Sequence, residues 1–147
     1  MRDETRLIQT GKLATLSDYK RYDNSPVKVA CSIYKGNSRI AASTNERKTH
    51  PIMHKYNREY INFTKKPFLH AEMNALLQAG WREGEGNLEG CTLYVARKLN
   101  VDGFGEARPC PTCMAAIIDS GIKKIVYTNN LGYTVKYLKN LESNDII

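Results

Sequence analysis

The stretch from Thr92 to Thr128 restricts the possible folds of this chain more than any other segment. It contains TLYVARK, then PCPTCMAAIIDSG, then KKIVYT. The first and last pieces have the composition of buried strands, and the middle piece is a helix entered through prolines and ended by Gly121. A helix that joins two strands of one sheet brings the second strand parallel to the first. The sequence therefore predicts an α/β fold that includes a parallel pair of strands.

The other segments fit the same class of fold. KVACSIYKGNSRIAAST predicts a β-hairpin that turns at Gly36-Asn37. HAEMNALLQAG predicts a helix that starts near His70 and ends at Gly80, and loosely helical apolar spacing predicts an N-terminal helix within residues 3–22. The tail YTVKYLKNLE is compatible with a helix or an edge strand. Together these elements predict an α/β sandwich.

Length and composition indicate one ordinary domain. The 147 residues are 41% hydrophobic and 25% charged, with no repeat or visible boundary, so residues 1–147 are expected to form a single domain. The charged N-terminus lacks the apolar region of a signal peptide and no apolar run is long enough to span a bilayer, which predicts a cytoplasmic protein without a membrane partner. The net charge of +7 suits an anionic partner such as a nucleotide or a nucleic acid, or simply a solvated basic surface.

The four cysteines divide into two kinds. A reducing compartment leaves thiols free, which favours metal binding or catalysis over cross-links. Cys110 and Cys113 have CxxC spacing at the start of a predicted helix, whereas Cys31 and Cys91 stand alone in strand-like apolar contexts. The latter pair is therefore predicted to be small core residues.

Two predicted helix starts carry the side chains of a metal site. One presents His70 and Glu72, and the other presents Cys110 and Cys113 on one face. One imidazole and two thiolates suit Zn²⁺, and three protein ligands leave the fourth position of a catalytic zinc for water. Glu72, two residues after His70, is then placed to take a proton from that water without being a ligand itself.

Other interpretations remain open at this point. A CxxC can be a redox pair, although no thioredoxin-like context surrounds this one, or it can belong to a structural zinc site. A structural site needs a fourth ligand, for which His50, His54, Cys31 and Cys91 are the candidates. His50 and His54 lie in a basic, proline-marked segment, residues 45–69, that predicts a long loop, and either fits a surface or substrate-side position better than a ligand position.

The paired motifs HAE and PCPTC, with TLYVARK between them and KKIVYT after them, resemble the zinc-dependent cytidine and deoxycytidylate deaminase superfamily, whose HxE and PCxxC signature is a general property of zinc deaminases. HAEMNALL and PCPTCMAAIIDSGIKKIVYT look most like the deoxycytidylate type, including phage-like versions. The resemblance implies a three-layer α/β/α sandwich with a mixed five-stranded sheet. It also implies zinc bound by His70, Cys110 and Cys113, with Glu72 moving the proton.

The resemblance further implies a set of residues around the substrate. The backbone N–H groups of Ala71 and Cys110 would donate to the base and the attacked centre, and Asn45 would contact the sugar, although a turn residue is nearly as good an interpretation of Asn45. The chain departs from the family where KLNVDGFGEAR follows the strand. Arg108 could there pair with a substrate phosphate or remain solvated, and His50 in RKTHP would lie near the substrate mouth.

The leading functional hypothesis is hydrolytic deamination of a free cytosine nucleotide or nucleoside, with deoxycytidylate preferred. A second hypothesis keeps the chemistry but places the base in single-stranded DNA or in RNA, including transfer RNA, which the basic charge and nine tyrosines would allow. A third is a zinc-stabilised binding module without catalysis. The resemblance also implies a homo-oligomer.

Overall fold

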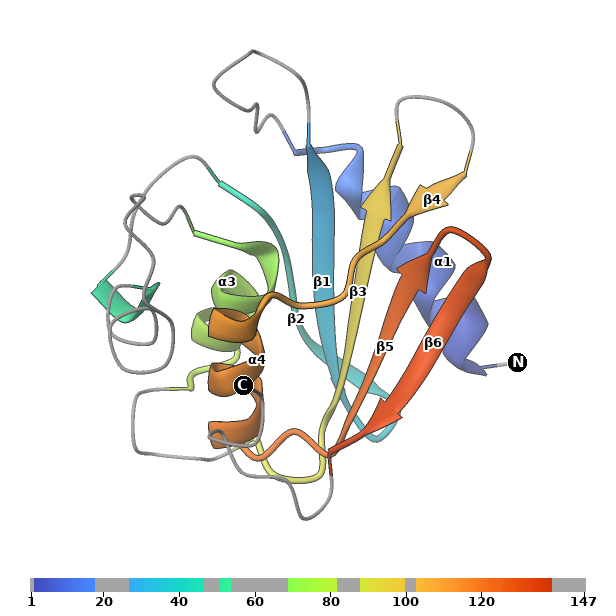
Figure 1. Cartoon of the computed structure of the whole chain (residues 1–147). Coiled ribbons are helices and arrows are strands. Elements are labelled where there is room, and N and C mark those ends of the chain that lie inside the picture. Colours follow the sequence, from blue (N-terminus) through green and yellow to red (C-terminus); the bar gives the residue numbers. More distant parts are fainter. Residues whose placement is uncertain are drawn as a thin grey trace.

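A mixed β-sheet forms the centre of the computed structural model (Figure 1), which describes residues 2–17, 27–46, 51–53, 69–81, 88–99 and 103–138. Its strands are β1 (Lys28–Lys35), β2 (Ser38–Thr44), β3 (Thr92–Lys98), β4 (Phe104–Gly105), β5 (Lys124–Asn129) and β6 (Gly132–Tyr137). Five of them follow the order β2-β1-β3-β5-β6. β3 and β5 are parallel and the other pairs are antiparallel, so the predicted crossover is confirmed.

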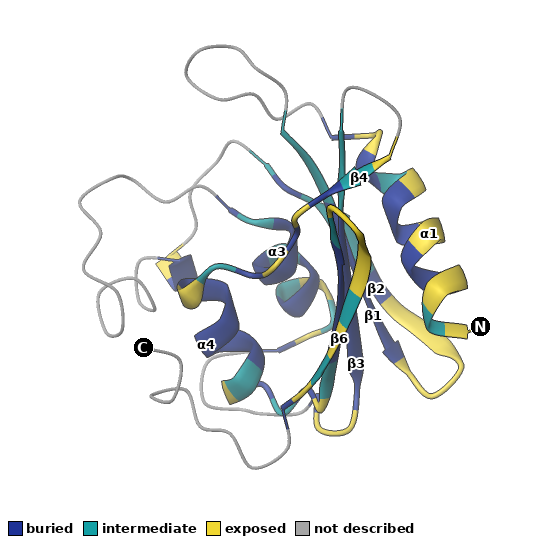
Figure 2. Cartoon of the chain, turned by 45° about the vertical axis from the view of Figure 1, so that its right-hand side comes forward, coloured by how far each residue is buried: buried dark blue, intermediate teal, exposed yellow. Residues whose placement is uncertain are grey.

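Helices cover both faces of the sheet. The helices with bounds in the described part of the chain are α1 (Arg2–Ala14), α3 (Ala71–Gln78) and α4 (Pro111–Asp119). α1 lies on one face, and α3 and α4 lie together on the other (Figures 1 and 2). The three-layer α/β/α architecture with a mixed sheet is therefore confirmed, with the two-residue β4 added to the five predicted strands as a sixth.

Side chains alternate between the two faces of each central strand and build two hydrophobic clusters. On β3, Leu93 and Val95 point to the large core under α3 and α4, whereas Tyr94 and Ala96 point to the smaller cluster under α1. Burial colours in Figure 2 show both layers of dark residues against the sheet. The period of two along a strand is what allows one sheet to serve two cores.

The helix ends follow local sequence rules. Gly80 has a φ of +90° after the C-cap Ala79, and the N–H groups of Gly80 and Trp81 donate to the carbonyls of Leu77 and Leu76. This is a Schellman motif, in which glycine is favoured because a side chain strains the left-handed conformation. The predicted end of the helix at Gly80 is confirmed.

Two predictions from periodicity gain their bounds or their type from the structure. The N-terminal helix predicted within residues 3–22 is confirmed as α1, which ends at Ala14, and Leu16 beyond it is 75% exposed. Its inward face includes Leu7, Thr10 and Ala14, so Leu16 had helical spacing without a sheet surface to cover. The tail that allowed a helix or a strand forms the edge strand β6, antiparallel to β5.

The predicted loop at residues 45–69 lies mostly outside the described residues. Its two ends meet, because Glu46 and Leu69 form an isolated β-bridge in which the Glu46 N–H donates to the Leu69 carbonyl at 3.0 Å. Within the described part of the chain, every helix falls short of the length and apolar character that crossing a bilayer requires.

Candidate active site

Two helix N-termini meet at the candidate metal centre. His70 is the N-cap of α3, Cys110 is the N-cap of α4, and Cys113 lies in the first turn of α4. The His70 Nδ1 atom is 3.5 Å from Cys110 Sγ and 3.3 Å from Cys113 Sγ. All three candidate ligand atoms lie within 4.8 Å of one another. The convergence expected from the sequence is present in the fold.

The geometry fits a tetrahedral zinc ion. Zinc bonds of about 2.0 Å to nitrogen and about 2.3 Å to sulfur place a nitrogen ligand and a sulfur ligand about 3.5 Å apart in a tetrahedron. The two nitrogen-to-sulfur distances here, 3.5 and 3.3 Å, are close to that value. Among the described residues, the only His, Cys, Asp or Glu group that could hold a metal ion contains these three side chains and no fourth.

The two remaining cysteines are accounted for by the core. Cys31 is fully buried and Cys91 is 1% exposed, and both belong to the large hydrophobic cluster. All four cysteines are free thiols. The prediction that Cys31 and Cys91 are core residues is confirmed.

Charges within the centre are strongly coupled. A hydrogen bond with Cys113 and the proximity of His70 outweigh burial and lower the pKa of the Cys110 thiol to about 4. The same hydrogen bond, together with burial, raises the pKa of Cys113 well above its ordinary value. Burial lowers the pKa of His70, but the hydrogen bond and charge of Cys110 outweigh it and raise that pKa to about 9. A divalent cation between these atoms would displace the protons and stabilise both sulfurs as thiolates.

Glu72 lies beside the centre in the first turn of α3. Its side chain is buried, with 6% exposure, and it lines the same cavity as His70 and Cys110. Burial raises the pKa of the Glu72 carboxyl, the charge of His70 lowers it, and the net result is a pKa of about 7. A carboxyl group poised near neutrality can both accept and release a proton.

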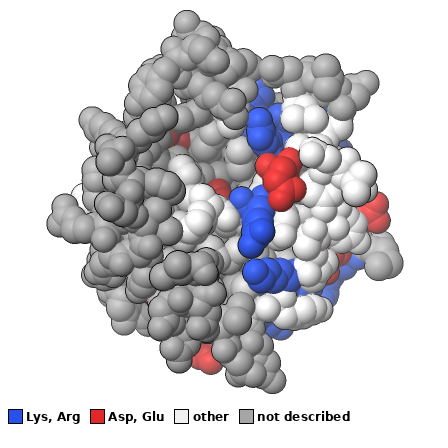
Figure 3. All heavy atoms as spheres, in the orientation of Figure 1, with Lys and Arg blue, Asp and Glu red and all other residues white. Residues whose placement is uncertain are grey.

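A cavity of about 220 Å³ opens next to these residues. Apolar side chains of Val27, Val29, Leu69 and Ala107 form much of its wall, and polar groups complete the lining: Asn45, His70, Glu72, Arg97, Glu106, Arg108 and Cys110. Apolar walls with a few placed polar groups are typical of small-molecule sites. On the face drawn in Figure 3, Lys and Arg side chains form a band with an acidic side chain among them.

The structure brings three of the four predicted substrate residues to this cavity. Ala71 lies at the first position of α3, and Arg108 is exposed on the segment that leads into α4. Asn45 also lines the cavity, but its amide is engaged, because Oδ1 accepts hydrogen bonds from Ser17 and Val29 and Nδ2 donates to the Val27 carbonyl. The fourth, His50, lies outside the described residues, as does His54.

Arg97 and Glu106 are cavity residues that the motifs did not single out. The sequence could have predicted which way Arg97 faces. Arg97 continues the alternation of Leu93 and Val95 along a predicted strand and therefore shares their face. No comparable signal exists for Glu106. Its position depends on the pairing of β4 with β3, which joins Arg97 to Gly105.

Comparison with known proteins defines the class to which this fold and site belong. The model of the family "Cytidine and deoxycytidylate deaminase zinc-binding region" matches residues 4–129. The chain belongs to this family, so the resemblance in its motifs is confirmed. Zinc as the cofactor is also confirmed, because the family is a zinc-binding region and a His/Cys/Cys group able to hold a metal is present.

Two relatives with a similar sequence are deoxycytidylate deaminases of phages. The deoxycytidylate deaminase of Enterobacteria phage T2 is 41% identical over 68 residues, which are 46% of this chain and 30% of that protein. The phage T4 enzyme of the same name gives an equal match over 29% of its length. The matched part therefore spans less than a third of these curated relatives.

Solved structures extend the likeness to most of the chain. The dCMP deaminase of cyanophage S-TIM5, solved in complex with dCMP and dUMP, is 25% identical with a TM-score of 0.54, covering 86% of this chain and 79% of that one. A cytidine deaminase from Burkholderia pseudomallei has the same TM-score at 20% identity over 97% of this chain and 94% of its own, which shows a shared fold.

Proposed function

We propose that this protein hydrolytically deaminates a free cytosine nucleotide or nucleoside, with deoxycytidylate preferred, to give the uracil product and ammonia. The observation that carries the proposal is the approach of His70 Nδ1 to two cysteine sulfurs, at 3.5 and 3.3 Å, in a cavity that Glu72 also lines. Relatives described as deoxycytidylate or dCMP deaminases support the choice of base and sugar.

His70, Cys110 and Cys113 would hold the zinc ion. Zinc bound there supplies a Lewis acid that makes hydroxide available near neutral pH. The start of α4 assists, because Cys110 Sγ accepts a hydrogen bond from the Cys113 N–H and the positive end of a helix dipole favours a thiolate.

Glu72 would carry the proton through the reaction. It accepts a proton from the attacking water as the oxygen bonds to C4 of cytosine, and it delivers that proton to the ring nitrogen N3. Glu72 then moves the proton of the new C4 hydroxyl to the amino group, the C4–N bond breaks to release ammonia, and the C4 carbonyl of uracil forms. Its pKa of about 7, raised chiefly by burial, suits a group that must take and return a proton.

The remaining cavity groups would hold the base. The backbone N–H groups of Ala71 and Cys110 lie at the starts of α3 and α4, where N–H groups lack partners within their own helix. They would donate to the base and the attacked centre, while the apolar walls exclude water from the ring. Asn45 Nδ2 donates one N–H to the Val27 carbonyl and would donate its second N–H to the sugar, while Oδ1 is held by Ser17 and Val29.

A Glu72→Gln variant tests the proposal. The substitution keeps the size of the side chain but removes proton transfer, so zinc content should stay at one ion per chain while turnover falls by roughly 10²- to 10⁴-fold. Zinc is measured by metal analysis, and ammonia release is measured on deoxycytidine, deoxycytidylate, its triphosphate and a short cytosine-containing oligonucleotide. Equal turnover by the variant and the wild type would contradict the role of Glu72.

The same panel separates the competing functions. Turnover of the oligonucleotide in preference to free deoxycytidylate would favour the nucleic-acid hypothesis, to which the net charge of +7 lends some support. Binding of that oligonucleotide should then fall steeply between 50 and 200 mM salt, since phosphate contacts release counterions. Zinc binding without turnover of any cytosine or adenine substrate would favour a non-catalytic module.

We also propose that residues 1–147 act as one domain and that copies of the chain assemble into a homo-oligomer, as the family resemblance implies. Light scattering measures the mass of the particle in solution. A mass equal to the 16.7 kDa of one chain would contradict the assembly.

A further inference from the structure

The hairpin of β3 and β4 brings charged side chains to the cavity. β4 pairs with the end of β3 through Arg97↔Gly105 and Lys98↔Phe104, and the chain then passes in front of the sheet toward α4 (Figure 1). Arg97, Glu106 and Arg108 all line the cavity. The hairpin and the segment that follows it thus place two guanidinium groups at the site that also contains Glu72.

Strand alternation directs Arg97 into the site. Leu93 and Val95 point to the core under α3 and α4, and Arg97 is the next residue on that face. Lys98, its neighbour, points to the opposite face, where its ammonium lies 6.0 Å from the Phe104 ring centroid. Only one of two adjacent basic residues therefore reaches the cavity.

Thr128 holds the backbone at Arg97 and at the residues just before Arg108. Its hydroxyl accepts a hydrogen bond from the Arg97 N–H at 3.1 Å and donates to the Gly105 carbonyl at 2.8 Å. Its carbonyl accepts from the Ala107 N–H at 2.9 Å. Thr128 is 2% exposed, so these contacts are shielded from water and hold residues 105–107 against the ends of β3 and β5. The segment that carries the arginines is thus held in place before a ligand arrives.

The guanidinium groups of Arg97 and Arg108 have no hydrogen bond or ion pair with another of the residues that the structure describes. Glu106 lines the same cavity and contributes one negative charge against two positive ones. Arg97, Glu106 and Arg108 together therefore carry a net positive charge. A guanidinium presents parallel N–H donors that match two phosphate oxygens, and such charge-assisted hydrogen bonds are the strong ones.

We propose that Arg97 and Arg108 together bind the phosphate group of a nucleoside monophosphate. The proposal rests on the deamination proposed above and adds Arg97 as a specificity-determining residue that makes the monophosphate a better substrate than the nucleoside. Arg97 belongs to the end of β3 and Arg108 to the segment between β4 and α4, so the phosphate would lie between two separate segments of the chain.

The test compares Arg97→Gln with Lys98→Gln as a matched control. Each variant removes one positive charge from adjacent positions of β3, but only Arg97 faces the cavity. Steady-state ammonia release is measured with deoxycytidylate and with deoxycytidine. Arg97→Gln should raise KM for deoxycytidylate roughly 10- to 100-fold and change kcat/KM for deoxycytidine by less than about threefold. Lys98→Gln should leave both substrates at wild-type values.

Binding of the products gives a second measurement that does not depend on turnover. By calorimetry, the wild type should bind deoxyuridylate at least about tenfold more tightly than deoxyuridine, and Arg97→Gln should remove most of that difference. Loss of activity on both substrates to the same extent, or an unchanged preference for the monophosphate, would overturn the role of Arg97. A wild type that deaminates no cytosine substrate but still binds deoxyuridylate through Arg97 would refute the proposed reaction while leaving the phosphate site intact.

Discussion

The four cysteines have the same side chain but lie in two kinds of surroundings in the fold. Cys110 and Cys113 lie at the start of α4 within reach of His70, whereas Cys91 precedes β3 and packs in the core with 1% exposure. A thiol held among apolar side chains is poorly ionised, and burial raises the pKa of Cys91 accordingly. The two kinds of cysteine should therefore respond differently to substitution.

Substitution of Cys113 by serine should remove zinc and stability together. Because metal binding stabilises only the folded state, a protein with free zinc a thousandfold above its Kd gains about 4 kcal/mol, and this is the stability that Cys113→Ser should lose. Thermal unfolding with and without a chelator measures the effect, and the chelator should lower the Tm of the wild type but not that of the variant.

Cys91→Ala is the matched control for that experiment. It should retain zinc and remain sensitive to the chelator, with only the modest loss of stability expected for a small core side chain. If Cys113→Ser kept its full zinc content, or if Cys91→Ala lost it, the assignment of the metal centre would be wrong.

Residue identities in the centre could be read from the sequence because the chemistry of zinc restricts them. An imidazole and two thiolates near helix starts, with a carboxylate beside them, leave few other uses for such a set. The cavity residues Arg97 and Glu106 were not identified, because their positions depend on contacts between β3 and β4. The contacts of Asn45 with Ser17, 28 positions away, were hidden for the same reason.

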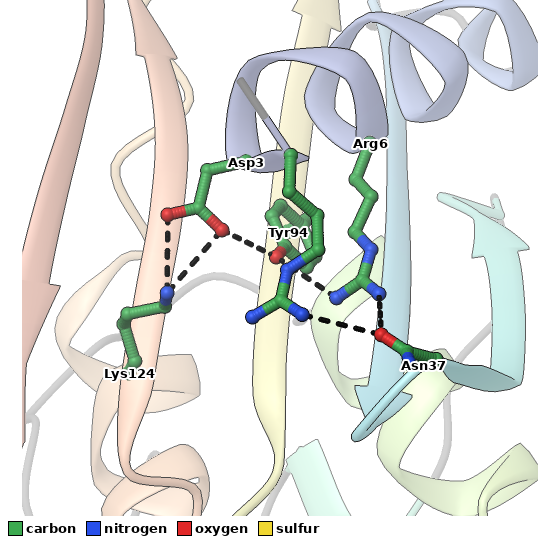
Figure 4. A network of polar contacts seen from close by, with 6 residues as sticks. Asp3, Arg6, Asn37, Tyr94 and Lys124 are labelled. Carbon is green, nitrogen blue, oxygen red and sulfur yellow. Dashed lines mark hydrogen bonds and ion pairs between the residues drawn. The ribbon is translucent and has the colours of Figure 1, made fainter.

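At the scale of elements, a network of polar contacts holds α1 against the sheet (Figure 4). The Tyr94 hydroxyl donates to Asp3 Oδ1 at 2.6 Å, and Lys124 on β5 forms an ion pair with Asp3 at 3.0 Å. Arg6 donates to the Tyr94 hydroxyl and to Asn37 Oδ1, and its guanidinium lies 4.0 Å from the Tyr34 ring centroid. The helix is therefore connected to β5, β3 and the turn between β1 and β2.

This network predicts a loss of stability in acid. Partial burial raises the pKa of the Asp3 carboxyl, but hydrogen bonds from Tyr94 and Lys124 and the charge of Lys124 outweigh it, so the pKa is lowered in the folded protein. A lowered pKa stabilises the fold above the unfolded value of about 4, and that contribution disappears as the pH falls through the folded value. Because the pair is partly open to solvent, we expect about 1 kcal/mol or less.

Denaturant unfolding of the wild type and Asp3→Asn between pH 7 and pH 2.5 measures this contribution. The variant should be less stable at pH 7, and the difference between the two proteins should shrink as the pH falls below about 4. A difference that stays constant over the whole range would contradict the role of the Asp3 charge.

Replacement of Gly11 in α1 by alanine should lower the stability of the protein, which is the opposite of its usual effect in a helix. Alanine normally stabilises a helix by up to about 1 kcal/mol relative to glycine. Here an added Cβ would lie 2.7 Å from Phe104 Cζ and closer still to Cε1, because the side chain of Phe104, on β4, packs directly on the helix. Gly11→Ala should therefore destabilise the protein by about 1 to 3 kcal/mol, as overpacking does.

A double-mutant cycle with Phe104→Ala checks the cause. Without the ring, alanine at position 11 should become neutral or stabilising, so urea midpoints should reveal a coupling between the two sites. Equal effects of Gly11→Ala with and without Phe104 would show that the ring is not responsible.

Long elements with clear periods were predictable, whereas short ones were not. The β3–α4–β5 unit follows from two apolar strands around a proline-started helix. β4 is only two residues long and forms by pairing with β3, so no local sequence pattern predicts it. The end of α1 at Ala14 could not be predicted, because helical spacing records where apolar residues such as Leu16 lie, and not which of them are covered in the fold.

For the whole molecule, the three layers place the chemistry at one end of the parallel pair. The chain enters α4 from the hairpin beyond β3, and α3 lies beside α4 on the same face (Figure 1). Both helix starts therefore meet near the end of β3, where Arg97 is the last residue but one, as expected for sites outside the carboxyl ends of parallel strands. The class of fold was predictable from the order of elements, but the lining of the cavity comes from segments that are distant in the chain.

The central claim is that one imidazole and two thiolates bind a single zinc ion and leave its fourth position to a small oxygen ligand. X-ray absorption spectroscopy at the zinc edge of the purified protein measures this directly. We predict two sulfur neighbours at about 2.3 Å, with one nitrogen and one further light atom at about 2.0 to 2.2 Å. A spectrum with three or four sulfur neighbours, or a second imidazole in place of the oxygen atom, would contradict the account.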